Sequence, residues 1–123
     1  MSMKKLFDES GGSAVAYTTA YIKHLIDLLE TLDPNDIAGI IEIFRNARAK
    51  GNTIYFLGNG GSAATSAHFA NDMTFGACPN GTQPFRAICL ASNSSVLTCL
   101  ANDIGYENVF SRQLRNLLRP GDV

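Results

Sequence analysis

Hydrophobic residues recur at the spacing of an amphipathic helix through the first fifty residues of the chain. From residue 13 to residue 32 they form a broad apolar face, which predicts a first helix. Asp33 and Pro34 break the pattern, and we expect Asp33 to cap a second helix that has Pro34 in its first turn. This helix should reach Ala49 and end at Gly51. Its residues expected to face inward are Ile37, Ile40, Ile41, Ile43 and Phe44.

The pattern then changes to that of a parallel α/β sheet. Residues 53–57 are β-branched or aromatic and apolar on both faces, which is typical of a buried parallel strand. A helix should follow Ser62 and end between residues 73 and 75, and turn residues predict a loop over residues 76–84. Residues 86–91 predict a second buried strand.

Two more helices are expected, at residues 95–102 and 106–118, with Gly105 between them. The chain then turns into Val123, as a third strand would begin. Because parallel sheets need several strands covered on both faces, either the chain is the first part of a longer α/β domain or other copies supply the missing surface. We expect one domain, with a helical segment at residues 1–50 and the start of a parallel core at residues 52–123.

Composition and charge exclude several function classes. The chain is 46% hydrophobic and 17% charged, which suits a packed core. Its net charge of −1 and the lack of a basic run argue against binding to nucleic acid. No apolar run is long enough to cross a bilayer, and the N-terminus turns acidic before any apolar core. We therefore expect no membrane segment and no signal peptide, and a cytoplasmic location.

The three cysteines do not indicate a metal or disulfide scaffold. Cys78, Cys89 and Cys99 are odd in number and lack the spacing of a zinc knuckle. Cys89 and Cys99 have apolar neighbours, so we interpret both as buried small hydrophobic residues rather than nucleophiles.

The strongest chemical signal is the turn Gly58-Asn59-Gly60-Gly61-Ser62, which joins the first strand to the next helix. Such a turn presents free backbone N–H groups and a positive helix end to an anion. A dinucleotide site is disfavoured because no carboxylate ends the next strand, and a P-loop because no lysine follows the glycines. We favour a phosphate anchor over the alternative, a tight turn that needs glycine only for its backbone freedom.

His68 and Asp72 lie four residues apart on the helix that follows this turn, so they share one helix face. Alone, each is more often an ordinary helical side chain. Together, about one turn from the anion-binding end, they can hold a divalent metal or act as an acid/base pair.

The other polar candidates carry weaker signals. From their local sequence, Asn102 and Asp103 fit a helix C-cap and a turn carboxylate. A functional role would require Asp103 to reach the same ligand site as the glycine turn. Three arginines on the last helix fit a solvated face or a subunit contact, and His24 fits a structural or surface role. The arginines are Arg112, Arg115 and Arg119.

These stretches resemble the sugar isomerase (SIS) domain family, and within it the phosphoheptose isomerases. The resemblance rests on the glycine turn, on His68-Phe69-Ala70, and on the run from Ser92 through Phe110. It implies an α/β fold, a three-layer parallel-sheet (flavodoxin-like) SIS domain with an N-terminal helix pair, of which this chain carries the N-terminal part.

The resemblance also implies an activity. The family enzyme interconverts sedoheptulose 7-phosphate and D-glycero-D-manno-heptose 7-phosphate through an enediol(ate), for heptose or surface-glycan precursors. It would be a homotetramer, often with zinc. His68 and Asp72 would be the catalytic and metal-binding residues. The sugar-phosphate contacts would fall on Asn59, Gly60, Gly61, Ser62, Asp72, Asn102 and Asp103.

The chain departs from the family pattern in three ways. The family usually has glutamate at Asp72 and an arginine one turn later, where this chain has Thr74-Phe75-Gly76. Its Ser/Thr-rich phosphate loop and a C-terminal helix with another histidine lie beyond the equivalent of Val123, so we expect this polypeptide alone to be inactive. The alternative function is a non-catalytic SIS scaffold, of the type that associates with a replication initiator, or a module that binds a sugar phosphate.

Overall fold

The computed structural model describes residues 3–79 and 81–123. The chain divides into two compact units, Met1–Ile40 and Ile41–Val123, and helix α3 (Pro34–Lys50) runs through the division. Among the described residues, none of the helices is both long and apolar enough to cross a membrane.

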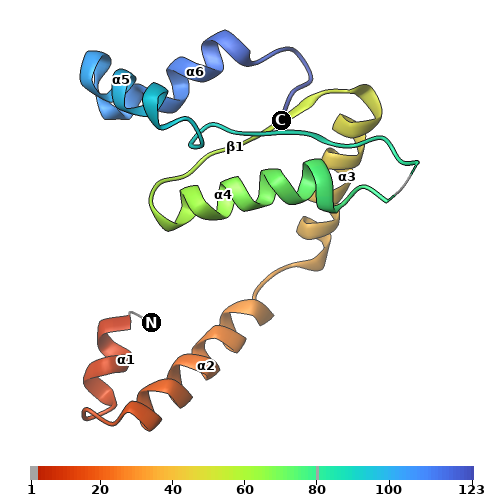
Figure 1. Cartoon of the computed structure of the whole chain (residues 1–123). Coiled ribbons are helices and arrows are strands. Elements are labelled where there is room, and N and C mark those ends of the chain that lie inside the picture. The colour runs from red at the N-terminus through yellow and green to blue at the C-terminus, as the bar shows by residue number, and fades with distance from the viewer. Residues whose placement is uncertain (1–2, 80) are drawn as a thin grey trace. The chain divides into compact units, whose positions relative to one another are not determined.

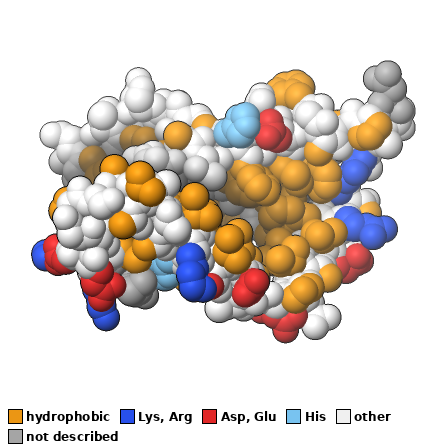
Figure 2. Space-filling view, turned by 90° about the horizontal axis from the view of Figure 1, so that it is seen from below, with side chains coloured by type: hydrophobic (Ala, Val, Ile, Leu, Met, Phe, Trp, Pro, Cys, Tyr) orange, Lys and Arg blue, Asp and Glu red, His pale blue; other side chains and the backbone are white. Residues whose placement is uncertain are grey.

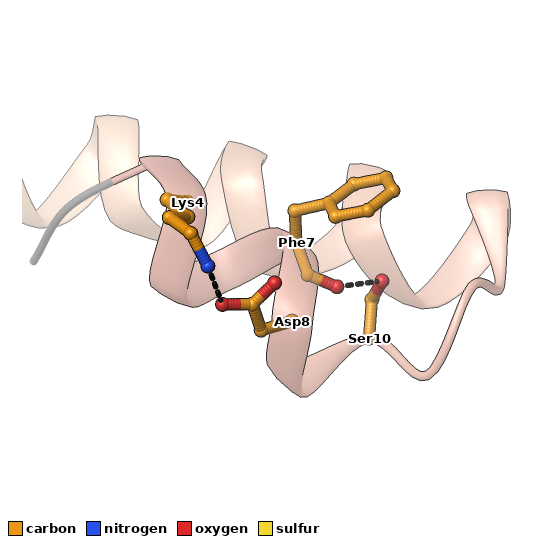
Figure 3. A network of polar contacts seen from close by, with 4 residues as sticks. All are labelled: Lys4, Phe7, Asp8 and Ser10. Carbon is orange, nitrogen blue, oxygen red and sulfur yellow. Dashed lines mark hydrogen bonds and ion pairs between the residues drawn. The ribbon is translucent and has the colours of Figure 1, made fainter.

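The N-terminal unit is built from α1 (Met3–Glu9), α2 (Ala14–Glu30) and the first part of α3. Helix α1 was not predicted from the sequence. It packs on α2 through the buried Leu6 and an edge-on contact between the Phe7 and Tyr17 rings. At the end of α1 the Ser10 hydroxyl donates to the Phe7 carbonyl, 2.6 Å away, and Lys4 pairs with Asp8 (Figure 3).

The two predicted N-terminal helices are confirmed, with their caps. The side chain of Ser13 accepts the amide of Ala16 at the start of α2. Asp33 precedes α3 and accepts the amide of Asn35 at 2.8 Å. Gly51 follows α3 with φ of +70°, a left-handed conformation that favours glycine.

The expected inward orientation of the α3 side chains is wrong for this chain. Four of the five residues are about half exposed and only Phe44 is partly covered, because the single chain offers too little surface to bury an apolar stripe on each long helix. The same holds for α2, which has no buried residue. Figure 2 shows broad areas of hydrophobic side chains on one face of the molecule. The exposed residues of α3 are Ile37, Ile40, Ile41 and Ile43.

The second unit contains a parallel sheet at the predicted positions. β1 (Thr53–Phe56) and β2 (Arg86–Cys89) pair in parallel, with Thr53 opposite Arg86 and Phe56 opposite Cys89. Each strand ends one or two residues before the predicted end. Ile54, at the centre of β1, is among the most buried residues of the chain.

The backbone of Val123 lies along the other edge of β1, as the expected start of a third strand would. Its amide donates to the Thr53 carbonyl at 2.9 Å, and its carbonyl accepts the Tyr55 amide at 2.7 Å. These two bonds bracket Ile54 in the pattern of a parallel ladder. β1 therefore lies between β2 and the residue at which a third strand would begin.

Helices cover the sheet on both faces, which gives the predicted three-layer α/β arrangement (Figure 1). The Phe56 ring of β1 lies 5.0 Å from the Phe69 ring of α4 (Gly61–Asn71) and 6.0 Å from that of Phe44 in α3. Tyr55, which points to the opposite face, donates to the Leu117 carbonyl at the end of α6 (Val109–Leu117).

The remaining helices differ from the prediction mainly at their ends. α4 continues into a π-helical turn, η1 (Asp72–Gly76). α5 (Ser94–Ile104) is capped by the side chain of Asn93, and Gly105 ends it with φ of +88°. The last predicted helix is divided into a 3₁₀ turn, η2 (Tyr106–Asn108), and α6.

The cysteine interpretation needs a correction. Cys99 is exposed because it lies on the outer side of α5, whereas Cys78 and Cys89 are half-buried. The apolar neighbours of Cys99 in the sequence do not share its helix face, since adjacent residues point about 100° apart.

Candidate functional site

The glycine turn connects β1 to α4 at the carboxyl end of the sheet. Gly60 is the N-cap of α4, so the helix begins at Gly61 and Ser62 already lies within its first turn, not at the cap position. Gly60 has φ of +55°, and a Cβ built on Gly58 would lie only 2.7 Å from the Ser62 carbonyl carbon. These two positions therefore require glycine for conformation and for close approach, respectively.

Part of the turn's hydrogen-bonding capacity is used internally and part is free. The Ser62 and Ala63 amides both donate to the Asn59 carbonyl, at 2.9 and 3.3 Å. Among the described residues the Gly60 and Gly61 amides have no acceptor, and the Ser62 hydroxyl has no partner. Two backbone donors and one hydroxyl at the start of α4 thus remain available to an anion.

His68 and Asp72 share one face of α4, as predicted. The predicted distance from the anion-binding end is wrong, because at 3.6 residues per turn they lie about two and three turns from Gly61 instead of about one. The His68 Nε2 atom lies 3.4 Å from the Asp72 Oδ2 atom, and the two side chains are 79% and 56% exposed. The opposite face of α4 packs inward through Ser66 and Ala70, which are buried. Such an exposed pair stabilises the fold little, so its atoms are free to engage a ligand.

Asp72 lies where α4 changes into the π-helical turn. Its carbonyl accepts the Ala77 amide at 2.6 Å, five residues on. The Thr74 hydroxyl donates to the Ala70 carbonyl and reaches the Ala87 carbonyl of β2 at 3.4 Å, which ties the turn to the sheet. Single π-turns of this kind are frequent at functional sites. No pattern in the sequence predicted this π-helical turn.

Asn102 and Asp103 lie in the last turn of α5, and both are exposed. The Asn102 side chain donates to Asp103 at 2.9 Å, and the Cys99 thiol lies 3.3 Å from the other carboxylate oxygen. The hydrogen bonds from Asn102 and then Cys99 hold the pKa of Asp103 below its ordinary value. The same carboxylate raises the pKa of the Cys99 thiol, which disfavours the thiolate.

A hydrogen bond links the glycine turn to the segment that follows α5. The Tyr106 hydroxyl donates to the Asn59 side-chain oxygen at 2.7 Å, across 47 positions of sequence. Tyr106 was not predicted to belong to the site, since no local pattern shows which distant group a tyrosine hydroxyl will reach. Among the described residues no hydrogen bond joins Asn102 or Asp103 to the turn, so Tyr106 carries the connection.

His68 and Asp72 are the two candidate metal ligands of this site. Among residues 3–79 and 81–123 no group of three or more His, Cys, Asp and Glu side chains could hold an ion. Zinc takes three or four protein ligands, so His68 and Asp72 fit half of such a site.

Comparison with known proteins identifies the family of the chain. The sequence pattern of the SIS domain family matches residues 16–123. The chain belongs to the SIS domain family. Among its relatives, a phosphoheptose isomerase of Aquifex aeolicus is 37% identical over 121 residues, covering 98% of this chain and 56% of that protein. A probable phosphoheptose isomerase of Thermoplasma acidophilum is 42% identical over 92 residues, covering 75% and 50%.

A solved SIS domain structure shares the fold. Phosphoheptose isomerase GmhA from Neisseria gonorrhoeae superposes with a TM-score of 0.74 at 33% identity, covering 88% of this chain and 55% of that one. The chain thus spans about half the length of the relatives it matches. The family and the three-layer fold expected from the sequence are confirmed.

Proposed function

We propose that this chain carries the first half of the active site of a phosphoheptose isomerase. The main support for this proposal is that one helix, α4, carries both groups. The free Gly60 and Gly61 amides lie at its start, and His68 and Asp72 lie on an exposed face of it. The relatives named phosphoheptose isomerase support the substrate class.

The proposed reaction interconverts sedoheptulose 7-phosphate and D-glycero-D-manno-heptose 7-phosphate. A base removes a proton from C1 of the ketose, the C–H electrons form the C1–C2 double bond, and the carbonyl oxygen takes the negative charge. The base then returns a proton to C2, while a proton moves from the C1 oxygen to the C2 oxygen, which leaves the aldehyde at C1 and a hydroxyl at C2. Such chemistry needs a base, donors for the enediolate oxygens and an anchor that fixes the substrate's position.

The residues of this chain divide these roles. Asp72 is the proposed base, since its side chain is more than half exposed and lies beside His68 on the same helix face. The Gly60 and Gly61 amides and the Ser62 hydroxyl are the proposed donors to substrate oxygens. Asn59 is proposed to contact the sugar phosphate, and Asn102 and Asp103 are proposed to contact the sugar hydroxyls.

A zinc ion is part of the proposal. When bound, zinc would supply Lewis-acid stabilisation of the enediolate. His68, with Asp72 as second ligand or as neighbouring base, would be its contribution from this chain. The remaining ligands would come from outside the described residues.

A homo-oligomer, expected to be a tetramer, is also proposed. Its support is the half-exposed apolar side chains of α2 and α3, which a second copy would cover. Light scattering of the purified full-length protein tests this directly, and a monomer would contradict it. The cytoplasmic location stays a prediction.

The test of function is an assay on the full-length protein. Purified protein is incubated with sedoheptulose 7-phosphate, and the appearance of the aldose C1 proton is followed by NMR. Conversion supports the isomerase. Binding of the sugar phosphate without conversion would instead support the non-catalytic SIS module.

A further inference from the structure

The hydrogen bond from the Tyr106 hydroxyl to the Asn59 side-chain oxygen, 2.7 Å long, crosses from η2 to the glycine turn. Asn59 immediately precedes Gly60 and Gly61, whose amides are free among the described residues. The contact therefore acts on the side chain that leads into the two free backbone donors.

Both ends of this bond are held by their local backbone. The carbonyl of Asn59 accepts the Ser62 amide at 2.9 Å, which fixes the residue against the start of α4. On the other side, η2 is closed by the Asn108 amide, which donates to the Gly105 carbonyl at 3.1 Å, and is followed by the buried Val109. The bond itself lies at the surface, since Tyr106 is 56% exposed and Asn59 is exposed, so the backbone contacts on each side hold its two ends.

The chemistry of the carboxamide gives the contact a consequence. An asparagine side chain has one acceptor oxygen and two N–H donors. Because Tyr106 donates to the oxygen, the amide N–H₂ group of Asn59 is left for a ligand, and it has no acceptor among the described residues. It adds side-chain donors to the two free backbone amides, so the turn offers several donors to an incoming oxygen.

We propose that Tyr106 is a positioning residue of this site, which orients the Asn59 amide so that its N–H₂ group donates to an anionic oxygen of the ligand. The ligand class is an oxyanion such as a phosphate monoester. The inference rests on the proposed function, and it deepens that function by naming a residue outside the turn that sets the turn's donor character.

The experiment compares Tyr106→Phe with the wild-type full-length protein. The variant removes only the hydroxyl oxygen, so the Asn59 amide loses its fixed orientation. We expect the KM for sedoheptulose 7-phosphate and the Kd for inorganic phosphate, measured by titration calorimetry, to rise about fivefold to tenfold, the effect of one neutral hydrogen bond. The kcat should stay within about twofold, since the base is untouched.

Tyr55→Phe is the matched control. Tyr55 also donates its hydroxyl across the second unit, to the Leu117 carbonyl at 3.1 Å, but its partner lies outside the turn. Loss of the Tyr55 hydroxyl should lower the thermal midpoint of unfolding about as much as Tyr106→Phe does. It should leave the KM for sedoheptulose 7-phosphate and the Kd for phosphate unchanged. Equal rises in both variants would show a merely structural effect and overturn the proposal.

A double-mutant cycle with Asn59→Ala identifies the route of the effect. If Tyr106 acts through Asn59, then Tyr106→Phe has no further effect on the phosphate Kd once Asn59 is alanine. Additive effects would overturn the proposal, as would a wild-type protein that does not bind phosphate. A protein that binds phosphate but does not isomerise the sugar would contradict the proposed function alone, because the Kd measurements still test Tyr106.

Discussion

Gly58 and Ser62 approach so closely that no side chain fits between them. A Cβ on Gly58 would lie 2.7 Å from the Ser62 carbonyl carbon and oxygen and 2.8 Å from the Ser62 Cβ. The contact is with backbone atoms at the start of α4, which cannot rotate away as a flexible side chain would. The turn that bears the free amides is therefore set by steric contact within five residues.

Gly58→Ala should accordingly destabilise the protein. We expect the free energy of unfolding to fall by about 1–3 kcal/mol, the usual effect of forcing an extra methyl group into a packed site. Urea unfolding measures this. Gly61→Ala is the matched control, because a Cβ there meets nothing within 4 Å and alanine favours a helix. Equal losses in the two variants would contradict the steric argument.

Much of the fold could be predicted from the sequence because it follows local rules. The apolar run of β1, the Asp33-Pro34 break and the glycine at the end of α3 each depend on near neighbours, and all are found at or near the predicted positions. Even Val123 pairs with β1 as the start of a third strand would, since the turn before it is local too.

The rest depended on contacts that no local pattern encodes. The apolar face of α3 that includes Ile40 and Ile41 could be recognised from the sequence. Whether another part of the chain or another subunit covers that face depends on tertiary or quaternary structure. The π-helical turn at Asp72 differs from the α-helix before it only in which carbonyl each backbone amide bonds to, so no residue pattern predicts it. Of the candidate site, the turn and the His68–Asp72 face were predictable from spacing. The link from Tyr106 to Asn59 spans 47 residues and was not.

Asp72→Asn tests the proposed base. The amide has nearly the same shape but cannot accept a proton, so we expect kcat for sedoheptulose 7-phosphate to fall about 10²- to 10⁴-fold with the fold intact by circular dichroism. Asp72→Glu keeps a carboxylate and should retain more turnover than Asp72→Asn. Asp8→Asn is the matched control, because Asp8 is also an exposed helical aspartate paired with the residue four before it. Near-normal turnover in Asp72→Asn would remove Asp72 from the mechanism.

His68→Ala tests the proposed metal ligand. If His68 binds zinc, the metal content of the purified full-length protein, measured by mass spectrometry, should fall from about one ion per subunit toward none. The parallel variant is His24→Ala, which removes the other histidine of the chain and lies on α2. Equal zinc in wild type and His68→Ala would count against His68 as a ligand.

The carboxylate of Asp122 should make stability sensitive to acid. It accepts the Thr53 amide at 2.8 Å and the Arg119 amide at 2.9 Å, and the bond from Thr53 is the main cause that lowers its pKa. A lowered pKa in the folded state stabilises the protein above the ordinary aspartate value of 3.8, and this stabilisation is lost as the pH falls through the lowered pKa.

Asp122→Asn should therefore be less stable than wild type at pH 7, and the difference should shrink as the pH falls below about 4. Urea unfolding at a series of pH values measures it. Asp8→Asn serves again as the control, since its exposed ion pair with Lys4 contributes little. A wild-type advantage over Asp122→Asn that stays constant down to pH 2 would contradict the linkage.

Cys99 should react slowly with alkylating reagents although it is exposed. The Asp103 carboxylate, 3.3 Å from its sulfur, raises the pKa of the thiol and so reduces the reactive thiolate at pH 8. Asp103→Asn removes this negative charge, and we expect alkylation of Cys99 by iodoacetamide, followed by peptide mass spectrometry, to become severalfold faster. Cys89 in the same sample is the internal control and should react at an unchanged rate. If Cys99 reacts equally fast in both proteins, the carboxylate does not govern the thiol.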